Sequence, residues 1–136
     1  MTGPLLNSDR LFQTLLATGL EYDVAGELDA DTIETMPAMV HSSSFQQNGN
    51  SDGLWQGILT VHLFAYAASA FTAAAELYEL IHSWGDHPLE GVVPGVGAVV
   101  TVEDMNSLSR SSGEVSMDNK QVVQFSGSFE ITIKHL

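Results

Sequence analysis

The chain has 136 residues and a formal net charge of −13, because 17 Asp and Glu residues face only four Lys and Arg residues. Such acidity repels phosphate, so it argues against a freely diffusing nucleic-acid binder and against a protein that binds anionic membranes. The absence of cysteine excludes a disulfide framework and any thiolate metal site. Neither a signal peptide nor an apolar run of roughly 20 residues is recognisable, so we expect one soluble domain over residues 1–136.

The N-terminal segments predict a helix, an acidic loop and a strand. Residues 9–18 carry Leu and Phe side chains on one helical stripe, with capping residues just before them. Residues 21–34 hold six carboxylates without a compensating cation and keep no long helical register, so most of this segment is predicted to be loop. Residues 33–46 alternate weakly and contain a proline, which is typical of an edge strand or of the start of a strand.

The longest apolar strand pattern, residues 54–66, leads directly into the best predicted helix. One parity of this strand is apolar throughout, and the other mixes polar with apolar residues, as expected for a face that is partly wet or meets another subunit. Residues 48–53 are rich in Asn and Gly and predict an antiparallel hairpin with the preceding strand. Ser69 offers an N-cap, and Gly85 and Pro88 should end the helix. Its apolar stripe is predicted to consist of Phe71, Ala74, Ala75, Leu77, Tyr78, Leu80, Ile81 and Trp84.

The C-terminal third predicts two strands around a long connection. A glycine- and proline-rich turn over residues 89–97 leads to a short strand at 98–102, and the Ser- and Asn-rich residues 105–119 predict a mobile loop. The last strand, 121–134, alternates most cleanly, and Gly127 on its apolar parity indicates a bulge or a close approach of another backbone. We therefore expect an α+β fold, with an antiparallel or mixed sheet of about four to five strands and two helices packed on one face.

No convergent catalytic constellation emerges from the sequence. His82, Asp86 and His87 cluster at the predicted end of the helix and are the best candidate metal ligands, yet their spacing is poor and a histidine at a helix C-terminus is favoured by the dipole anyway. The serines 42–44 lack a glycine-flanked nucleophile elbow, and the glycines of 91–97 lack the lysine of a phosphate loop. We expect a protein that is not an enzyme and that needs no cofactor.

Two sets of residues are candidates for interaction. The predicted loop 105–119 spaces apolar side chains among polar ones, which suits ordering against a partner rather than within the subunit. The acidic segment is most simply a solvated face, but in a ring it would line a negatively charged passage. The candidate docking residues are Met105, Leu108, Arg110, Val115 and Met117, and the candidate lumen residues are Asp23, Glu27, Asp29 and Asp31.

Three stretches carry a resemblance to a known family: Met36–Val40, Thr60–Ala67 running into the helix that ends near Trp84, and the strand 121–134. In order of elements and length, the chain resembles the tail terminator proteins of long-tailed bacteriophages. The resemblance covers nearly the whole chain and lies in its layout rather than in a signature motif. It implies a subunit that forms a homo-oligomer, usually a hexameric ring, on the end of the finished tail tube.

The resemblance also implies partners and a location. The ring would bind the tail tube protein, stop its polymerisation, and meet the head-tail connector protein, while DNA passes through its lumen without specific binding. The protein would be assembled in the host cytoplasm and would reside in the virion tail, with no membrane contact. The alternatives are another head-tail connector or tail tube component, or a small metal-binding enzyme that uses His82, Asp86 and His87.

Overall fold

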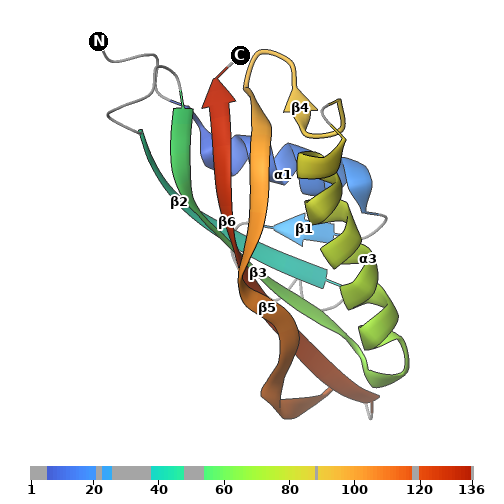
Figure 1. The fold of residues 1–136 in the computed structure, drawn as a ribbon. Coiled ribbons are helices and arrows are strands. Elements are labelled where there is room, and N and C mark those ends of the chain that lie inside the picture. Colours follow the sequence, from blue (N-terminus) through green and yellow to red (C-terminus); the bar gives the residue numbers. More distant parts are fainter. Residues whose placement is uncertain are drawn as a thin grey trace.

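The structure is a computed structural model that describes residues 6–20, 23–25, 38–47, 54–87, 89–117 and 120–135. Figure 1 shows a strongly twisted sheet with helices α1 (Ser8–Gly19) and α3 (Ala67–Asp86) on one side. The described strands form one six-stranded sheet in the order β1-β2-β3-β6-β5-β4. Their bounds are β1 Asp23–Ala25, β2 Ala38–Gln47, β3 Leu54–Tyr66, β4 Val92–Val93, β5 Gly97–Met117 and β6 Lys120–His135. The predicted α+β class, with two helices on one face of a mixed sheet, is confirmed.

The four long strands are antiparallel neighbours, and the two short strands cover only parts of the sheet edges. β2 pairs with β3 as the predicted hairpin requires, although residues 48–53 lie outside the described residues. β3 pairs with β6 along its whole length, from Leu54 opposite Lys134 to Tyr66 opposite Val122. β1 runs parallel to the first three residues of β2, and β4 pairs only with Gly97 and Ala98 of β5. Among the described residues, most of the outer edge of β5 therefore carries no strand.

The core lies between the sheet and the two helices. The predicted apolar parity of β3 is confirmed, because Leu59, Val61 and Leu63 are fully buried and Trp55 is nearly so. Phe12 of α1 packs between Phe45 and Trp84, with ring centroids 5.4 and 5.9 Å apart, and so joins α1 to both β2 and α3. The apolar stripe predicted for the first helix is also confirmed, because it consists of the buried residues Leu11, Phe12, Leu15 and Leu16.

Polar contacts fix the position of α1 on β2. Asp9 accepts a hydrogen bond from the Ser43 hydroxyl at 2.7 Å, and His41 Nε2 lies 2.7 Å from Oε1 of Gln13. His41 is only 3% exposed, and its burial lowers its pKa more than the nearby charge of Asp9 raises it. Burial thus favours the neutral form of the imidazole, which can be buried without a charged partner.

The N-terminus of α1 has a side-chain cap, whereas α3 begins two residues before the predicted N-cap. Asn7 caps α1, since its side chain accepts a hydrogen bond from the Arg10 amide. α3 begins at Ala67 directly after β3, so Ser69, the predicted N-cap, instead lies inside the first turn. Its hydroxyl donates to the Tyr66 carbonyl at 3.4 Å. The strand continues into the helix without a linker, and Tyr66 occupies the N-cap position without a side-chain hydrogen bond.

The prediction of a loop over residues 105–119 is wrong for residues 105–117, because β5 continues to Met117 and pairs with β6 throughout. β5 has 21 residues and β6 has 16, and four register shifts in β5 absorb the difference. Three of the shifts insert one extra residue and switch the side chains that follow to the opposite parity, and the fourth inserts two, so the alternation by which a strand is recognised is lost. Bulges also increase twist, which accounts for the curled β5 in Figure 1.

The other predicted segments are the C-terminal strands and the acidic loop. The short strand predicted at 98–102 is the start of β5, and the strand predicted at 121–134 is β6. Within the acidic segment predicted as loop, Asp23–Ala25 form β1, while residues 26–34 lie outside the described residues. In the ranges that are described, no helix is both long enough and apolar enough to cross a membrane.

Replacing Leu63 or Ile131 with Asp should unfold the subunit. Both side chains have no exposed surface and face the helices, so each carboxylate would be buried without a partner, at a cost of several kcal/mol against a typical total stability of about 5 to 15 kcal/mol. Ser42→Asp is the matched control, because Ser42 is exposed on the opposite face of the sheet. Denaturant unfolding followed by circular dichroism measures all three. Cooperative folding of both core variants with unchanged midpoints would contradict this packing.

Replacing Gly127 with Ala should destabilise the subunit by about 1 to 3 kcal/mol, as overpacking usually does. A Cβ at this position would lie 2.8 Å from Cα and 3.0 Å from N of Leu108, which are backbone atoms of the bulge in β5 and have little room to move. Thr132→Ala, on the other face of the same strand, provides the comparison. The denaturation midpoint is the measurement, and a Gly127 variant as stable as the unchanged chain would show that the close approach is not constraining.

Candidate interaction surface

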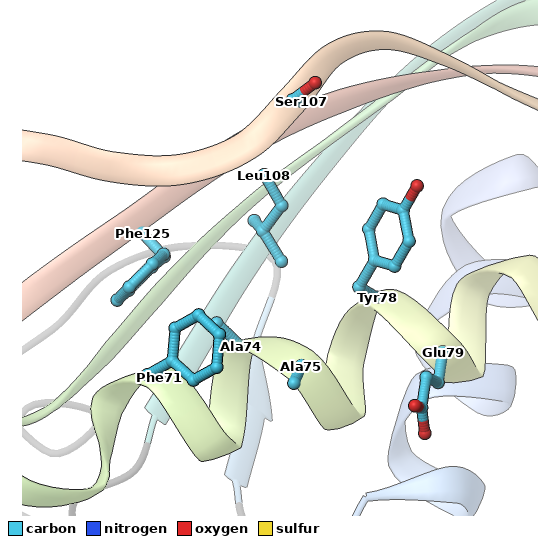
Figure 2. A pocket seen from close by; sticks show the side chains of 8 residues that line it. All are labelled: Phe71, Ala74, Ala75, Tyr78, Glu79, Ser107, Leu108 and Phe125. Atoms are coloured by element: carbon cyan, nitrogen blue, oxygen red, sulfur yellow. The ribbon is translucent and has the colours of Figure 1, made fainter.

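An apolar groove of about 360 Å³ lies between the first turns of α3 and strands β5 and β6. Figure 2 shows the side chains of Phe71, Leu108 and Phe125 converging on one space from three different elements. Phe71 is 75% exposed and Tyr78 is 36% exposed, although both are large apolar side chains that line the same groove. The residues that line the groove are Phe71, Ala74, Ala75, Tyr78, Glu79, Ser107, Leu108 and Phe125.

The exposure of Phe71 corrects its predicted place in the core. The buried face of α3 consists of Ala70, Ala73, Ala74, Leu77, Ile81 and Trp84. Phe71 follows Ala70 and so stands about 100° around the helix from it, beside the sheet rather than above it. Small alanines occupy the buried positions of the first turns, which brings the helix close to the sheet and leaves Phe71 at the rim. The predicted stripe was right for Ala74, Leu77, Ile81 and Trp84, and it was too broad because Phe71, Ala75 and Tyr78 are exposed.

The bulge in β5 directs Leu108 into this groove. Asn106 pairs with Ser128 and Ser109 with Ser126, so two residues of β5, Ser107 and Leu108, face only Gly127 of β6. Because Gly127 has no side chain, the Leu108 backbone folds over it on the face that carries α3. The close approach predicted at Gly127 is thus confirmed, and the bulge lies in the neighbouring strand. Figure 2 shows the Leu108 side chain extending toward the helix.

A cluster of three polar residues closes one end of the groove by joining α3 to β5. The Tyr78 hydroxyl donates to Oδ2 of Asp104 at 2.6 Å, and Nε2 of His82 lies 2.9 Å from Oδ1 of the same carboxylate. The hydrogen bond from Tyr78, helped by His82 and opposed by partial burial, lowers the pKa of Asp104 below its ordinary value of 3.8. The same hydrogen bond is the main reason that the pKa of Tyr78 rises above 10.0.

The predicted docking residues are distributed unevenly around this groove. Leu108 lines it, Arg110 stands beside it because it pairs in register with Phe125, and Met105 is 52% exposed on β5. Val115 and Met117 belong to β5, but their side chains lie outside the described residues. Sequence reasoning missed Phe71, Tyr78 and Phe125, which share the groove with Leu108. Only the alignment of α3 with β5 and β6 brings these residues together.

The predicted lumen residues cannot be placed as a group. Asp23 belongs to β1 at one edge of the sheet, and its side chain lies outside the described residues. Glu27, Asp29 and Asp31 also lie outside the described residues. Their assignment to a lumen therefore stays a prediction.

The predicted metal ligands are not brought together as a triad. His82 turns to Asp104 on β5, a partner 22 positions along the chain that sequence spacing did not reveal. Asp86 is the last residue of α3 and His87 caps it, and both are exposed. Among the described residues, no group of three or more His, Asp or Glu side chains is placed to hold a metal ion.

The sheet face opposite the helices is polar and carries cross-strand hydrogen bonds. Gln56 donates to Glu130 at 2.8 Å, Thr60 lies 3.2 Å from Ser128, and His62 lies 2.8 Å from Ser126. Neither described helix packs on this face, and it is the mixed parity that the sequence assigned to a wet or subunit-contacting surface. Most of its side chains are uncharged, although the chain as a whole is strongly acidic.

Comparison with known proteins adds no family assignment. No family model matches the chain, and no curated protein matches it. One similar solved structure corresponds to 90% of this chain and 94% of its own, at 14% identity and a TM-score of 0.44. A TM-score of this size carries no argument about function, which therefore has to come from the surfaces described above.

Replacing Asp104 with Asn should lower the free energy of unfolding by up to about 1 kcal/mol at neutral pH, a small value because solvent screens exposed hydrogen bonds. The pKa of Asp104 is lower in the folded state than in the unfolded chain, so its carboxylate stabilises the fold above pH 3.8. This stabilisation is lost as the pH falls through the pKa that Asp104 has in the folded state. The raised pKa of Tyr78 gives stability below 10.0 that is lost as the pH rises through its folded value.

The free energy of unfolding in urea should therefore differ most between the Asp104→Asn variant and the unchanged chain at pH values between 3.8 and 10.0. In acid the two free energies should become equal. Glu103→Gln, which removes an exposed carboxylate from the neighbouring position, is the control and should not show this pH dependence. A difference between the Asp104 variant and the unchanged chain that stays constant from neutral pH to acid would contradict the assigned hydrogen bonds.

Proposed function

We propose that this protein is a structural assembly protein of a bacteriophage tail, a tail terminator that forms a homo-oligomeric ring, usually a hexamer in such proteins. The ring caps the finished tail tube, stops polymerisation of the tube protein and presents its other surface to the head-tail connector protein. DNA passes through the lumen and is not bound specifically. The protein acts without catalysis or a cofactor, and its place is in the virion tail after assembly in the host cytoplasm.

The observation that supports this proposal best is the apolar groove beside the open edge of β5. Phe71, Tyr78 and Leu108 present apolar surface to solvent in a chain whose high net charge would otherwise keep it monomeric. Next to them, β5 offers unpaired backbone donors and acceptors along most of the edge that the described residues leave without a strand. Apolar surface next to an open edge is typical of a subunit that meets other subunits.

Acidity and the polar sheet face support the same proposal. A net charge of −13 disfavours binding to DNA, which suits a ring whose lumen DNA has to traverse. The hydrogen-bonded face over β3 and β6 has few charges, so a second protein can cover it without leaving buried charges unpaired. Both features fit a protein whose surfaces are made for contact with other virion proteins.

Electron microscopy of the purified protein, alone and mixed with tail tubes of the same virus, should show a single ring at one end of each tube. Tubes assembled in its presence should be uniform in length, because capping stops elongation. Long tubes formed by this protein alone would indicate a tube subunit, and rings that bind the head portal but not the tube would indicate a connector. The Phe71→Asp variant, which places a charge at the rim of the groove, should cap tubes less well than the unchanged chain. Ala17→Asp, which places a charge at an exposed position of α1 away from the groove and from the polar sheet face, should cap tubes normally.

A further inference from the structure

Leu89 is the most exposed large apolar side chain among the described residues, at 90%. It lies in the segment that follows α3, where hydrogen bonds hold the described residues on both sides of it. The Glu90 amide donates to the His87 carbonyl at 2.9 Å, and the Val99 amide donates to the Gly91 carbonyl at 2.8 Å. Gly91 packs so closely on Trp84 that a Cβ would stand 2.9 Å from the Trp84 carbonyl oxygen. Leu89 therefore projects from a fixed turn.

The groove lies along residues 71–79 of α3, and the projecting leucine lies beyond the C-terminal end of the same helix. α3 has 20 residues, which corresponds to a length of about 30 Å. Phe71 marks its first turns and Leu89 follows its last residue, so Leu89 cannot reach the groove of its own subunit. The projection beyond the helix and the groove along it form a complementary pair between two copies of the chain.

We propose that Leu89 of one subunit inserts into the groove formed by Phe71, Leu108 and Phe125 of the next subunit. This contact rests on the proposed homo-oligomeric ring and specifies how its subunits meet. It is heterologous, because the two partners use different surfaces, and a repeated heterologous contact forms a ring where its rotation closes and an open filament where it does not. A two-fold dimer would instead use the same surface twice.

The groove has the size and the charge that this occupant requires. A cavity of about 150 Å³ accommodates benzene, so a groove of about 360 Å³ has room for a leucine side chain and part of its turn. Asp86 and Glu90, both exposed, flank Leu89, and Arg110 stands beside the groove opposite Phe125. In the proposed contact, Asp86 and Glu90 of one subunit would lie near Arg110 of the next subunit, which is one of the chain's four Lys and Arg residues.

The carboxylates that already lie near the groove do not oppose this contact. Asp104 is engaged by Tyr78 and His82, which direct its oxygens toward α3. Figure 2 shows the Glu79 side chain pointing away from the space between Phe71, Leu108 and Phe125. The groove is therefore open to an apolar side chain that carries acidic neighbours on the side of Arg110.

Because the chain contains no cysteine, disulfide cross-linking tests the contact directly. Leu89→Cys and Phe71→Cys change exposed side chains, so neither substitution should disturb folding. When subunits of the two variants are mixed in one oligomer and then oxidised, they should form a disulfide-linked dimer. Each variant by itself should form none. The double variant should give a series of covalent multimers that ends at the size of the closed ring. Leu89→Cys mixed with Ser42→Cys, which is exposed on the other sheet face, is the matched control.

A charge exchange provides a second measurement on the same samples. Arg110→Glu in the Phe71→Cys chain should reduce cross-linking several-fold, and Glu90→Arg in the Leu89→Cys chain should restore it. Such restoration would not follow from a general loss of stability.

The possible failures of the two proposals can be distinguished. If the unchanged chain forms rings and caps tubes, but Leu89→Cys and Phe71→Cys cross-link no better than the control pair, the contact is wrong and the proposed function stands. Cross-linking of Leu89→Cys with itself would indicate a two-fold contact and overturn the head-to-tail arrangement. If Phe71→Cys becomes protected from thiol reagents only when tail tubes are added, the occupant is another protein. An unchanged chain that neither oligomerises nor binds tubes would overturn both proposals.

Discussion

The continuous antiparallel pairing of β3 with β6 is the constraint on which the rest of the subunit depends. It extends from Leu54 opposite Lys134 to Tyr66 opposite Val122, and it gives the sheet one apolar face and one polar face. The apolar face holds both helices and the shared core, while the polar face joins its strands through side-chain hydrogen bonds. Because α3 follows β3 without a linker, the direction in which β3 leaves the sheet also determines where the helix begins.

The bulges in β5 convert this regular pair into a surface with distinct features. β5 is longer than the strand that it accompanies, and the surplus residues are absorbed as register shifts. One shift lies opposite Gly127, where the missing side chain admits the Leu108 backbone. Another lies next to Asp104, whose carboxylate then reaches Tyr78 and His82 on α3. The groove and the polar cluster at its end are therefore consequences of the same irregular strand.

The proposed head-to-tail contact explains how an acidic protein can associate with itself. Repulsion between copies of a chain with a charge of −13 has to be overcome by local apolar burial and by attraction to its few cations. Leu89 supplies the apolar side chain, the groove supplies its site, and Arg110 lies where the acidic neighbours of Leu89 would arrive. The segment that carries Leu89 and the groove both keep a fixed geometry, which limits the conformational entropy that is lost on association. The polar sheet face stays available for a different partner.

Local patterns by themselves determined most of the elements. The alternation in 54–66 and 121–134 and the stripe of the first helix are set by neighbouring residues, so the sequence predicted these strands, this helix and the faces that they bury. Tertiary structure alone decided the rest. Residues 105–117 of β5 were mistaken for a loop because bulges disrupt their alternation. The pairing of His82 with Asp104 depends on a register between α3 and β5 that no local spacing encodes. Leu108 was predicted as a docking residue from its apolar character, but its neighbours Phe71 and Phe125 come from distant elements. They meet only because alanines bring α3 close to the sheet and Gly127 lets β5 fold over it.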